Sequence, residues 1–297
     1  MIWVTWRQHR TQAIICLGVF CALAIFAVAV GSLMRSAFDA DGLGACLARS
    51  GGSGCPAVIT SFVHRFNGPG AITATLPLFV IPGLVGVVVG APLLGRELEQ
   101  GTWQLAWSQT VPRTRWLVTK LALVTGGLVV FGAAITAVMS WYHAPLDRVS
   151  TRLQPPPFNY EGVLLLCSLL CAFGLGVLAG LLLRNTIGGM VVAYIAWEIP
   201  TAVTTLLNGP IQFPPAATER ITCQASCTAA STNSTPPVTG HLGDLVLNVV
   251  HHGDQLIVTY IPASRFWALQ LIEGGIFLAI AAAALGTAVW LLHRRTT

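Results

Sequence analysis

Residues 13–34 read AIICLGVFCALAIFAVAVGSLM, a run of 22 positions without a charged side chain. As a helix rising about 1.5 Å per residue, this run is long enough to cross a hydrocarbon core about 30 Å thick. The whole chain shares this character, because 54% of its 297 residues are hydrophobic and 9% are charged, against roughly a quarter charged in soluble domains. Composition therefore predicts a polytopic membrane protein and argues against a soluble enzyme, a disordered chain or a nucleic-acid-binding protein.

Further apolar runs are long enough to cross the membrane. They cover residues 71–95, 121–141, 162–183, 186–207 and 266–292. Because lipid offers the backbone no hydrogen-bond partners, each run is expected to be a helix. The predicted fold class is an all-α membrane protein, in which residues 1–297 form a single transmembrane domain with six transmembrane helices. The fourth and fifth spans are separated only by Arg184 and Asn185, which predicts an antiparallel hairpin.

Basic residues indicate which side of the membrane each connecting segment faces. One set of segments holds nine Lys and Arg residues in 44 positions, and the other holds seven in 114. The first set comprises 1–12, 96–120, 184–185 and 293–297, and the second comprises 35–70, 142–161 and 208–265. The positive-inside rule places the first set, with both termini, in the cytoplasm. Within 1–12, Trp3 and Trp6 oppose Arg7 and Arg10, a pattern typical of a helix lying in the membrane interface or of an ordinary flank.

The largest outer segment, 208–265, is expected to form a small extracellular cap loop. Its stretch HLGDLVLNVVHH, residues 241–252, has the composition of a short amphipathic helix. Four cysteines lie in the outer segments, and local disulfide pairing favours Cys46 with Cys55 and Cys223 with Cys227, with reduced thiols as the alternative. Because no histidine stands at ligand spacing beside these cysteines, no metal site is predicted.

Two acidic residues and one proline mark a candidate translocation pathway. Glu198 and Glu273 fall within apolar spans, where an ionised carboxylate facing lipid costs about 2.5–3.5 kcal/mol. Each is therefore expected to face protein or water, as a transport group or as a structural acid. Pro82 lies in the second span among other prolines and glycines, and we expect that helix to be kinked or broken and to line the pathway.

Motifs of known catalytic sites are missing from the sequence. It contains no HExxH, GxSxG or GxGxxG pattern. Lys120, the one lysine of the chain, follows Thr119 and precedes Leu121, so no phosphate-binding loop of the Gly-Lys-Ser/Thr type exists. We predict no catalytic residues, no bound cofactor and no ATPase activity of this chain itself.

The cytoplasmic segment 96–120 has the character of a docking element. Residues Arg96 to Gln100 can form a helical turn that Gly101 interrupts, and Thr102 can cap a second short helix. Trp103 and Trp107 stand four positions apart and present apolar surface that needs a partner. Anchoring at the lipid headgroups is the alternative.

The stretches PLLGRELEQGTWQLAWSQTVPRTRW (92–116) and SRFWALQLIEGG (264–275), with the six-span layout, resemble an actinobacterial type-2 ABC transporter permease over the whole chain. The resemblance implies a coupling helix after the second span that docks on a separate ATPase subunit, which carries ATP and Mg, with the N-terminal in-plane helix at the same contact. It further implies two ATPase copies, a second or homologous permease, and export across a bacterial plasma membrane. The coupling residues would be Arg96, Glu97, Glu99, Gln100, Gly101, Thr102, Trp103 and Trp107.

The cargo expected from the apolar spans is hydrophobic or amphipathic, such as a drug, lipid or peptide. Two other functions stay open. In a proton-coupled secondary transporter, Glu198 and Glu273 would exchange protons and transport would need no ATP. In a membrane sensor or scaffold, the outer loops would bind a ligand without moving it.

Overall fold

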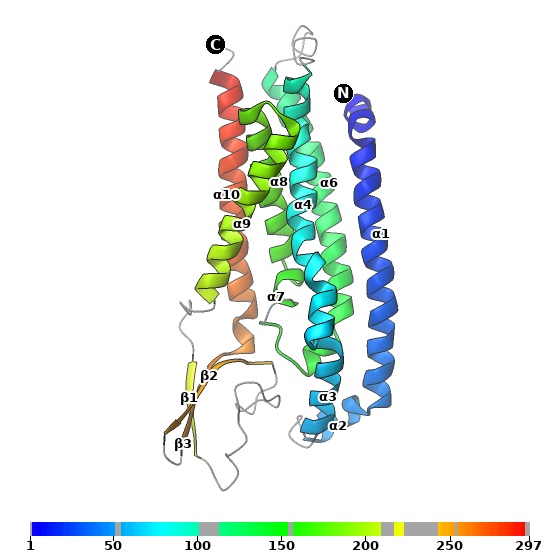
Figure 1. Ribbon diagram of the computed structural model, residues 1–297, viewed down its shortest axis with the longest axis vertical. Helices are drawn as coiled ribbons and strands as arrows, with labels where there is room; N and C mark the ends of the chain where they lie inside the picture. Colours follow the sequence, from blue (N-terminus) through cyan, green and yellow to red (C-terminus); the bar gives the residue numbers. More distant parts are fainter. Residues whose placement is uncertain are drawn as a thin grey trace.

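The computed structural model describes residues 2–50, 55–100, 113–153, 157–208, 217–222, 243–252 and 255–294 (Figure 1). Within these residues, six helices are long and apolar enough to cross a membrane. They are α1 (Ile2–Ala40), α4 (Pro69–Glu99), α6 (Arg113–His143), α8 (Leu164–Leu183), α9 (Thr186–Asn208) and α10 (Phe266–Arg294). The predicted fold class, a helical membrane protein with six spans, is confirmed.

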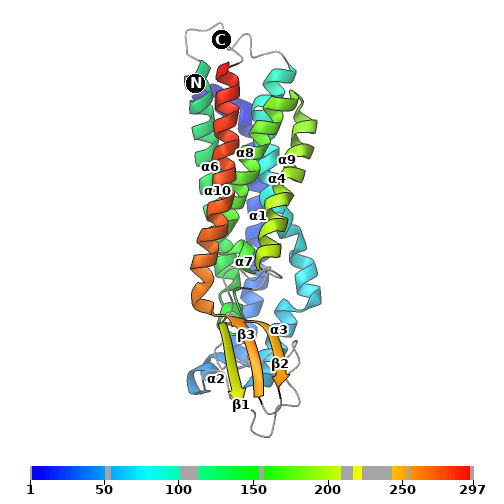
Figure 2. The same cartoon turned by 90° about the vertical axis from the view of Figure 1, so that its left-hand side faces the viewer.

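Figures 1 and 2 place both chain ends at one end of the bundle, here called the termini end. The opposite end, here called the sheet end, carries the strands and the short helices α2 (Leu43–Ser50) and α3 (Pro56–Asn67). The described segment between α6 and α8 contains η1 (Leu146–Arg148) and α7 (Pro157–Tyr160). An even number of spans requires this arrangement of the termini.

Helix α8 is the central element of the bundle. Most of its residues are buried, whereas few residues of α1 between Ala13 and Ala40 are buried, which suits that helix to contact with lipid. Close approach between α4 and α8 depends on glycine. A Cβ on Gly86 would lie 2.6 Å from the Leu169 carbonyl oxygen, and one on Gly180 would clash with the Ala91 carbonyl oxygen. Small residues therefore bring these two helices into backbone contact, as in other membrane bundles.

Arg184 and Asn185 join α8 and α9 as the predicted hairpin. Arg184 ends α8 in the left-handed conformation, at φ 52°. The Asn185 Oδ1 then accepts a hydrogen bond of 2.7 Å from the Gly188 backbone nitrogen, which caps the start of α9. Two residues suffice to reverse the chain because Arg184 supplies the backbone turn that ends α8 and Asn185 accepts a hydrogen bond from a free N–H group at the start of α9.

The described part of the 208–265 segment forms an antiparallel sheet rather than a helix. Its strands are β1 (Ala217–Thr222), β2 (Leu245–His252) and β3 (Gln255–Ile261), in the order β1-β3-β2. The prediction of a short amphipathic helix over 241–252 is wrong. Residues 245–250 (LVLNVV) are rich in β-branched Val, and β3 supplies the backbone partners for pairing, with His252 opposite Gln255.

The structure bears on two further expectations about helices. The second span is not broken, because α4 is continuous through Pro82 and Pro92. The expected N-terminal in-plane helix is continuous with the first span, because α1 is one helix from Ile2 to Ala40. Its first turns run across the long axis of the bundle (Figures 1 and 2).

The segment 35–70, which the sequence predicts to lie outside, is largely helical in its described residues. It contains the last turns of α1, then α2 and α3, and Cys46 of α2 forms a disulfide with Cys55, the residue before α3. Cys223 and Cys227 lie outside the described residues. The Cys46–Cys55 bridge links α2 to the start of α3, and both short helices contact α1 at the sheet end.

Candidate functional site

The termini end of α4 is tied to α6 by a buried ion pair. The Lys120 Nζ of α6 lies 2.7 Å from Glu97 Oε1 and donates a second hydrogen bond, of 3.1 Å, to the Leu93 carbonyl oxygen. The Lys120 side chain is 4% exposed and that of Glu97 is 16% exposed. The sole lysine of the chain is therefore a structural clamp on the last turns of α4.

Glu99, two residues further, ties α4 to α9. Its Oε2 accepts hydrogen bonds from the backbone nitrogen of Thr186 at 3.1 Å and from the Thr186 hydroxyl at 2.8 Å. Thr186 is the first residue of α9, where a carboxylate satisfies free backbone N–H groups and the positive end of the helix dipole. The C-terminal turn of α4 thus contacts both α6 and α9 through acidic side chains.

The remaining predicted coupling residues divide into two groups. Arg96 and Gln100 are exposed at the end of α4, and the Gln100 backbone nitrogen closes the last turn on the Arg96 carbonyl oxygen at 3.0 Å. Gly101, Thr102, Trp103 and Trp107 lie outside the described residues. A docking element in 101–112 would therefore begin directly after a braced helix end, and the docking roles stay predictions.

The two membrane acids have opposite surroundings. Glu198, near the middle of α9, is exposed and interacts with Tyr194 one turn earlier. Glu273, in α10, is 6% exposed and is enclosed by the bundle. Because an ionised carboxylate is unfavourable against lipid, Glu198 on the exposed face of α9 requires a polar neighbour or water.

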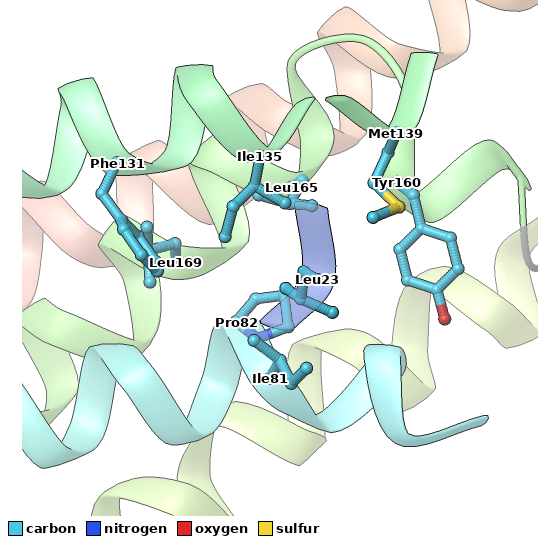
Figure 3. A pocket seen from close by; sticks show the side chains of 9 residues that line it. All are labelled: Leu23, Ile81, Pro82, Phe131, Ile135, Met139, Tyr160, Leu165 and Leu169. Atoms are coloured by element: carbon cyan, nitrogen blue, oxygen red, sulfur yellow. The ribbon is translucent and has the colours of Figure 1, made fainter. Parts of the chain in front are cut away.

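Pro82 lines a narrow apolar pocket between α1, α4, α6 and α8 (Figure 3). The pocket has about 10 Å³ of room for a water-sized sphere, close to the least that can hold one water molecule. Its walls include Leu23, Ile135 and Leu169, and Tyr160 lies at one end beside Met139. Neither Glu198 nor Glu273 lines this pocket, so the structure does not bring the three predicted pathway residues together.

A second polar cluster, which sequence reasoning missed, lies where α6 and α8 meet toward the sheet end. The Arg152 Nε donates a hydrogen bond of 2.7 Å to Glu161 Oε2, and its Nη2 lies 2.6 Å from the same oxygen. The Arg152 Nε also lies 3.4 Å from Asp147 Oδ2. The Glu161 side chain is fully buried. Burial raises the pKa of both acids, and their mutual contact raises that of Glu161 further.

Neighbouring side chains link this carboxyl cluster to three helices. His143 Nδ1 of α6 lies 3.5 Å from Glu161 Oε1. On the α10 side, the buried Gln270 donates a hydrogen bond of 2.6 Å from Nε2 to the Phe158 carbonyl oxygen. Its Oε1 accepts a hydrogen bond of 2.9 Å from the Leu164 backbone nitrogen. Among the described residues, no group of three or more His, Cys, Asp or Glu side chains has a geometry that could hold a metal ion.

Comparison with known protein families gives a match to a membrane transporter family. The family model described as ABC-2 membrane transporter related matches residues 17–208, which is more than half of the chain. No curated protein and no solved structure matches. The matched range runs from α1 to the end of α9 and so includes the braced end of α4. The chain accordingly belongs to the ABC-2 membrane transporter related family and is a multi-pass membrane permease.

Proposed function

We propose that this chain is the membrane-spanning subunit of an ATP-driven exporter. A separate ABC ATPase, present in two copies, supplies ATP hydrolysis with its own ATP and Mg, and a second permease copy or a homologous permease completes the pathway. The termini end faces the cytoplasm and the sheet end faces outward in a bacterial plasma membrane. ABC-2 family membership supports this reading.

The observation that carries the proposal is the braced end of α4. A coupling segment must transmit force from an ATPase into the membrane, which requires the helix end from which the segment begins to be rigid. At the end of α4, Glu97 forms an ion pair with Lys120 of α6, and Glu99 accepts a hydrogen bond from Thr186 of α9. A displacement of residues 101–112 by a docked ATPase would therefore move α4, α6 and α9 together.

The exposed carboxyl of Glu198 supports a pathway on the α9 face. It stands among exposed apolar residues, including Ile195 at 59% and Ile199 at 61%. A second permease packed on this face, enclosing a wet pathway, would relieve Glu198 of contact with lipid. The apolar residues around it favour a hydrophobic or amphipathic cargo, such as a drug, lipid or peptide.

Co-purification of the tagged protein from its native host in mild detergent tests the proposal. We expect a stoichiometric P-loop ATPase whose vanadate-sensitive hydrolysis accompanies uptake into inside-out vesicles. Gly101→Arg, in the coupling segment, should abolish both ATPase association and transport. Gly44→Arg, the same substitution at an exposed residue near the sheet end, should preserve both.

Transport that persists without ATP would instead support the proton-coupled transporter. Ligand binding without any transport would support the sensor or scaffold. Unchanged export by Gly101→Arg would contradict the assignment of the coupling segment, even if an ATPase co-purifies.

A further inference from the structure

Asp147 and Glu161 share one guanidinium group. The same Arg152 Nε lies 2.7 Å from Glu161 Oε2 and 3.4 Å from Asp147 Oδ2. Two carboxyl groups that contact one nitrogen atom are close neighbours, and two negative charges at such a separation repel strongly. Arg152 can compensate one of these charges but not both.

The groups that face the two acids come from each element packed around them. His143 approaches from α6. Tyr160 of α7 stacks on the His143 ring with a centroid distance of 6.3 Å. From α10 come Phe266 and Gln270, which carry no charge. Arg148 of η1 is directed elsewhere, over the Phe38 ring of α1. Among the described residues, Arg152 is therefore the one permanent positive charge in contact with the two carboxyl groups.

Burial makes the surplus negative charge unfavourable. Glu161 is fully buried, and its Oε1 has no hydrogen-bond partner among the described residues. His143 Nδ1 is 3.5 Å from that oxygen, but it also lies 3.2 Å from the Met139 carbonyl oxygen, which competes for its proton. An ionised carboxylate in such a place is destabilised relative to the neutral acid, so binding of a proton removes the penalty.

We propose that Asp147 and Glu161 form a proton-binding site, in which one proton held between the two carboxyl groups keeps α6, α8 and α10 joined toward the sheet end. With the proton bound, the cluster contains one carboxylate, one carboxylic acid and one guanidinium, and is neutral. Without the proton, it holds one uncompensated negative charge. The site stands on the geometry of this chain and does not depend on the proposed export function.

The position of the site explains how one proton would act on three helices. Glu161 is separated from α8 only by Gly162, in the left-handed conformation at φ 66°, and Val163. Arg152, which holds the acids, lies over the Phe266 ring at the start of α10 with a separation of 4.4 Å. A charge left unpaired here draws water into the junction of α6, α8 and α10 and weakens their contact.

Infrared spectroscopy of the purified full-length protein tests the site directly. At about pH 6, well above the usual glutamate pKa of about 4.3, the wild-type protein should show a carboxylic-acid C=O band assigned to the pair. Glu161→Gln should remove this band. Asp147→Asn should remove it too, because Glu161 would then face Arg152 alone and ionise.

Control variants separate this band from those of the membrane acids. Glu198→Gln and Glu273→Gln should each leave the Asp147–Glu161 band unchanged. A wild-type spectrum without the band at this pH would overturn the proposal. So would a band that survives in both Glu161→Gln and Asp147→Asn.

A second readout follows from proton linkage. Because the folded protein raises the pKa of Glu161, its contribution to stability is complete below the usual glutamate value and is lost as the pH rises through the folded value. Wild-type resistance to unfolding in mixed detergent should therefore fall as the pH increases from about 4.3 upward, whereas Glu161→Gln should be markedly less sensitive. An equal slope in the two proteins would contradict the site.

Discussion

Replacing Lys120 by Met should remove the clamp between α4 and α6 while keeping a side chain of similar length. The substitution deletes the 2.7 Å contact with Glu97 and the 3.1 Å hydrogen bond to the Leu93 carbonyl oxygen. It leaves the Glu97 carboxylate without the charge of Lys120 in a site where its side chain is 16% exposed. Breaking a fully buried pair costs about 3–5 kcal/mol, and the partial exposure of Glu97 favours the lower end, about 3 kcal/mol.

Reversible unfolding of the purified protein in mixed micelles of SDS and mild detergent measures this loss. The double variant Glu97→Gln/Lys120→Met removes both charges and should recover part of the stability, giving a coupling energy of about 2 kcal/mol in a double-mutant cycle. Arg96→Met, at an exposed position one residue before Glu97, is the matched control and should change stability by less than about 0.5 kcal/mol. If Lys120→Met matched this control, or the cycle gave no coupling, the clamp would be refuted.

Further substitutions test other contacts in the same unfolding assay. Gly86→Ala should cost about 1–3 kcal/mol, because its Cβ would lie 2.6 Å from the Leu169 carbonyl oxygen, whereas Gly127→Ala, with no atom within 4 Å of the new Cβ, should be neutral or stabilising. Cys46→Ser should cost on the order of 2–3 kcal/mol and abolish the loss of stability that reduction of the Cys46–Cys55 bridge causes, because this bridge closes a short loop. Gln270→Leu should cost about 2 kcal/mol or more by leaving two buried backbone groups without partners. A loss below about 0.5 kcal/mol for Gly86, Cys46 or Gln270 would contradict the corresponding contact.

Long apolar runs are the part of this fold that the sequence predicts well. The requirement to close every backbone hydrogen bond in lipid leaves one solution for a charge-free run of about 20 residues. The ends of the helices are predicted less well. The span expected at 121–141 is the middle of α6, which extends from Arg113 to His143. In water and at the interface, charged residues are compatible with helix, so hydropathy does not mark where the helix stops.

The sheet could not be inferred because its strands are short and separated. Residues 245–252 alone suit an amphipathic helix or a strand, and short apolar runs leave that choice open. Pairing with β3 decides in favour of a strand, because β3 lies between β1 and β2 and forms backbone hydrogen bonds with both. Pairing partners in separate segments are a tertiary property that no local pattern contains.

Side-chain partners were the least predictable feature of the candidate sites. Sequence reasoning selected Glu97 and Glu99 for docking, yet their contacts are Lys120 and Thr186, 23 and 87 positions away. The acids at Asp147 and Glu161 were missed because they lie in a segment treated as a connector. One signal was available: opposite charges concentrated in a short apolar-flanked loop, in a chain with only 9% charged residues.

Contact between α4 and α8 connects the two polar clusters mechanically. Glu97 and Glu99 fix the last turns of α4 at the termini end, and Glu161 lies just before α8 toward the sheet end. Between these points the helices touch at backbone level, where Gly86 and Gly180 leave no room for a Cβ atom. Close-packed elements move as units rather than deform continuously. A displacement at the end of α4 is therefore expected to carry α8 with it and to reach the Asp147–Glu161 cluster, where the proposed proton would oppose separation of α8 from α10.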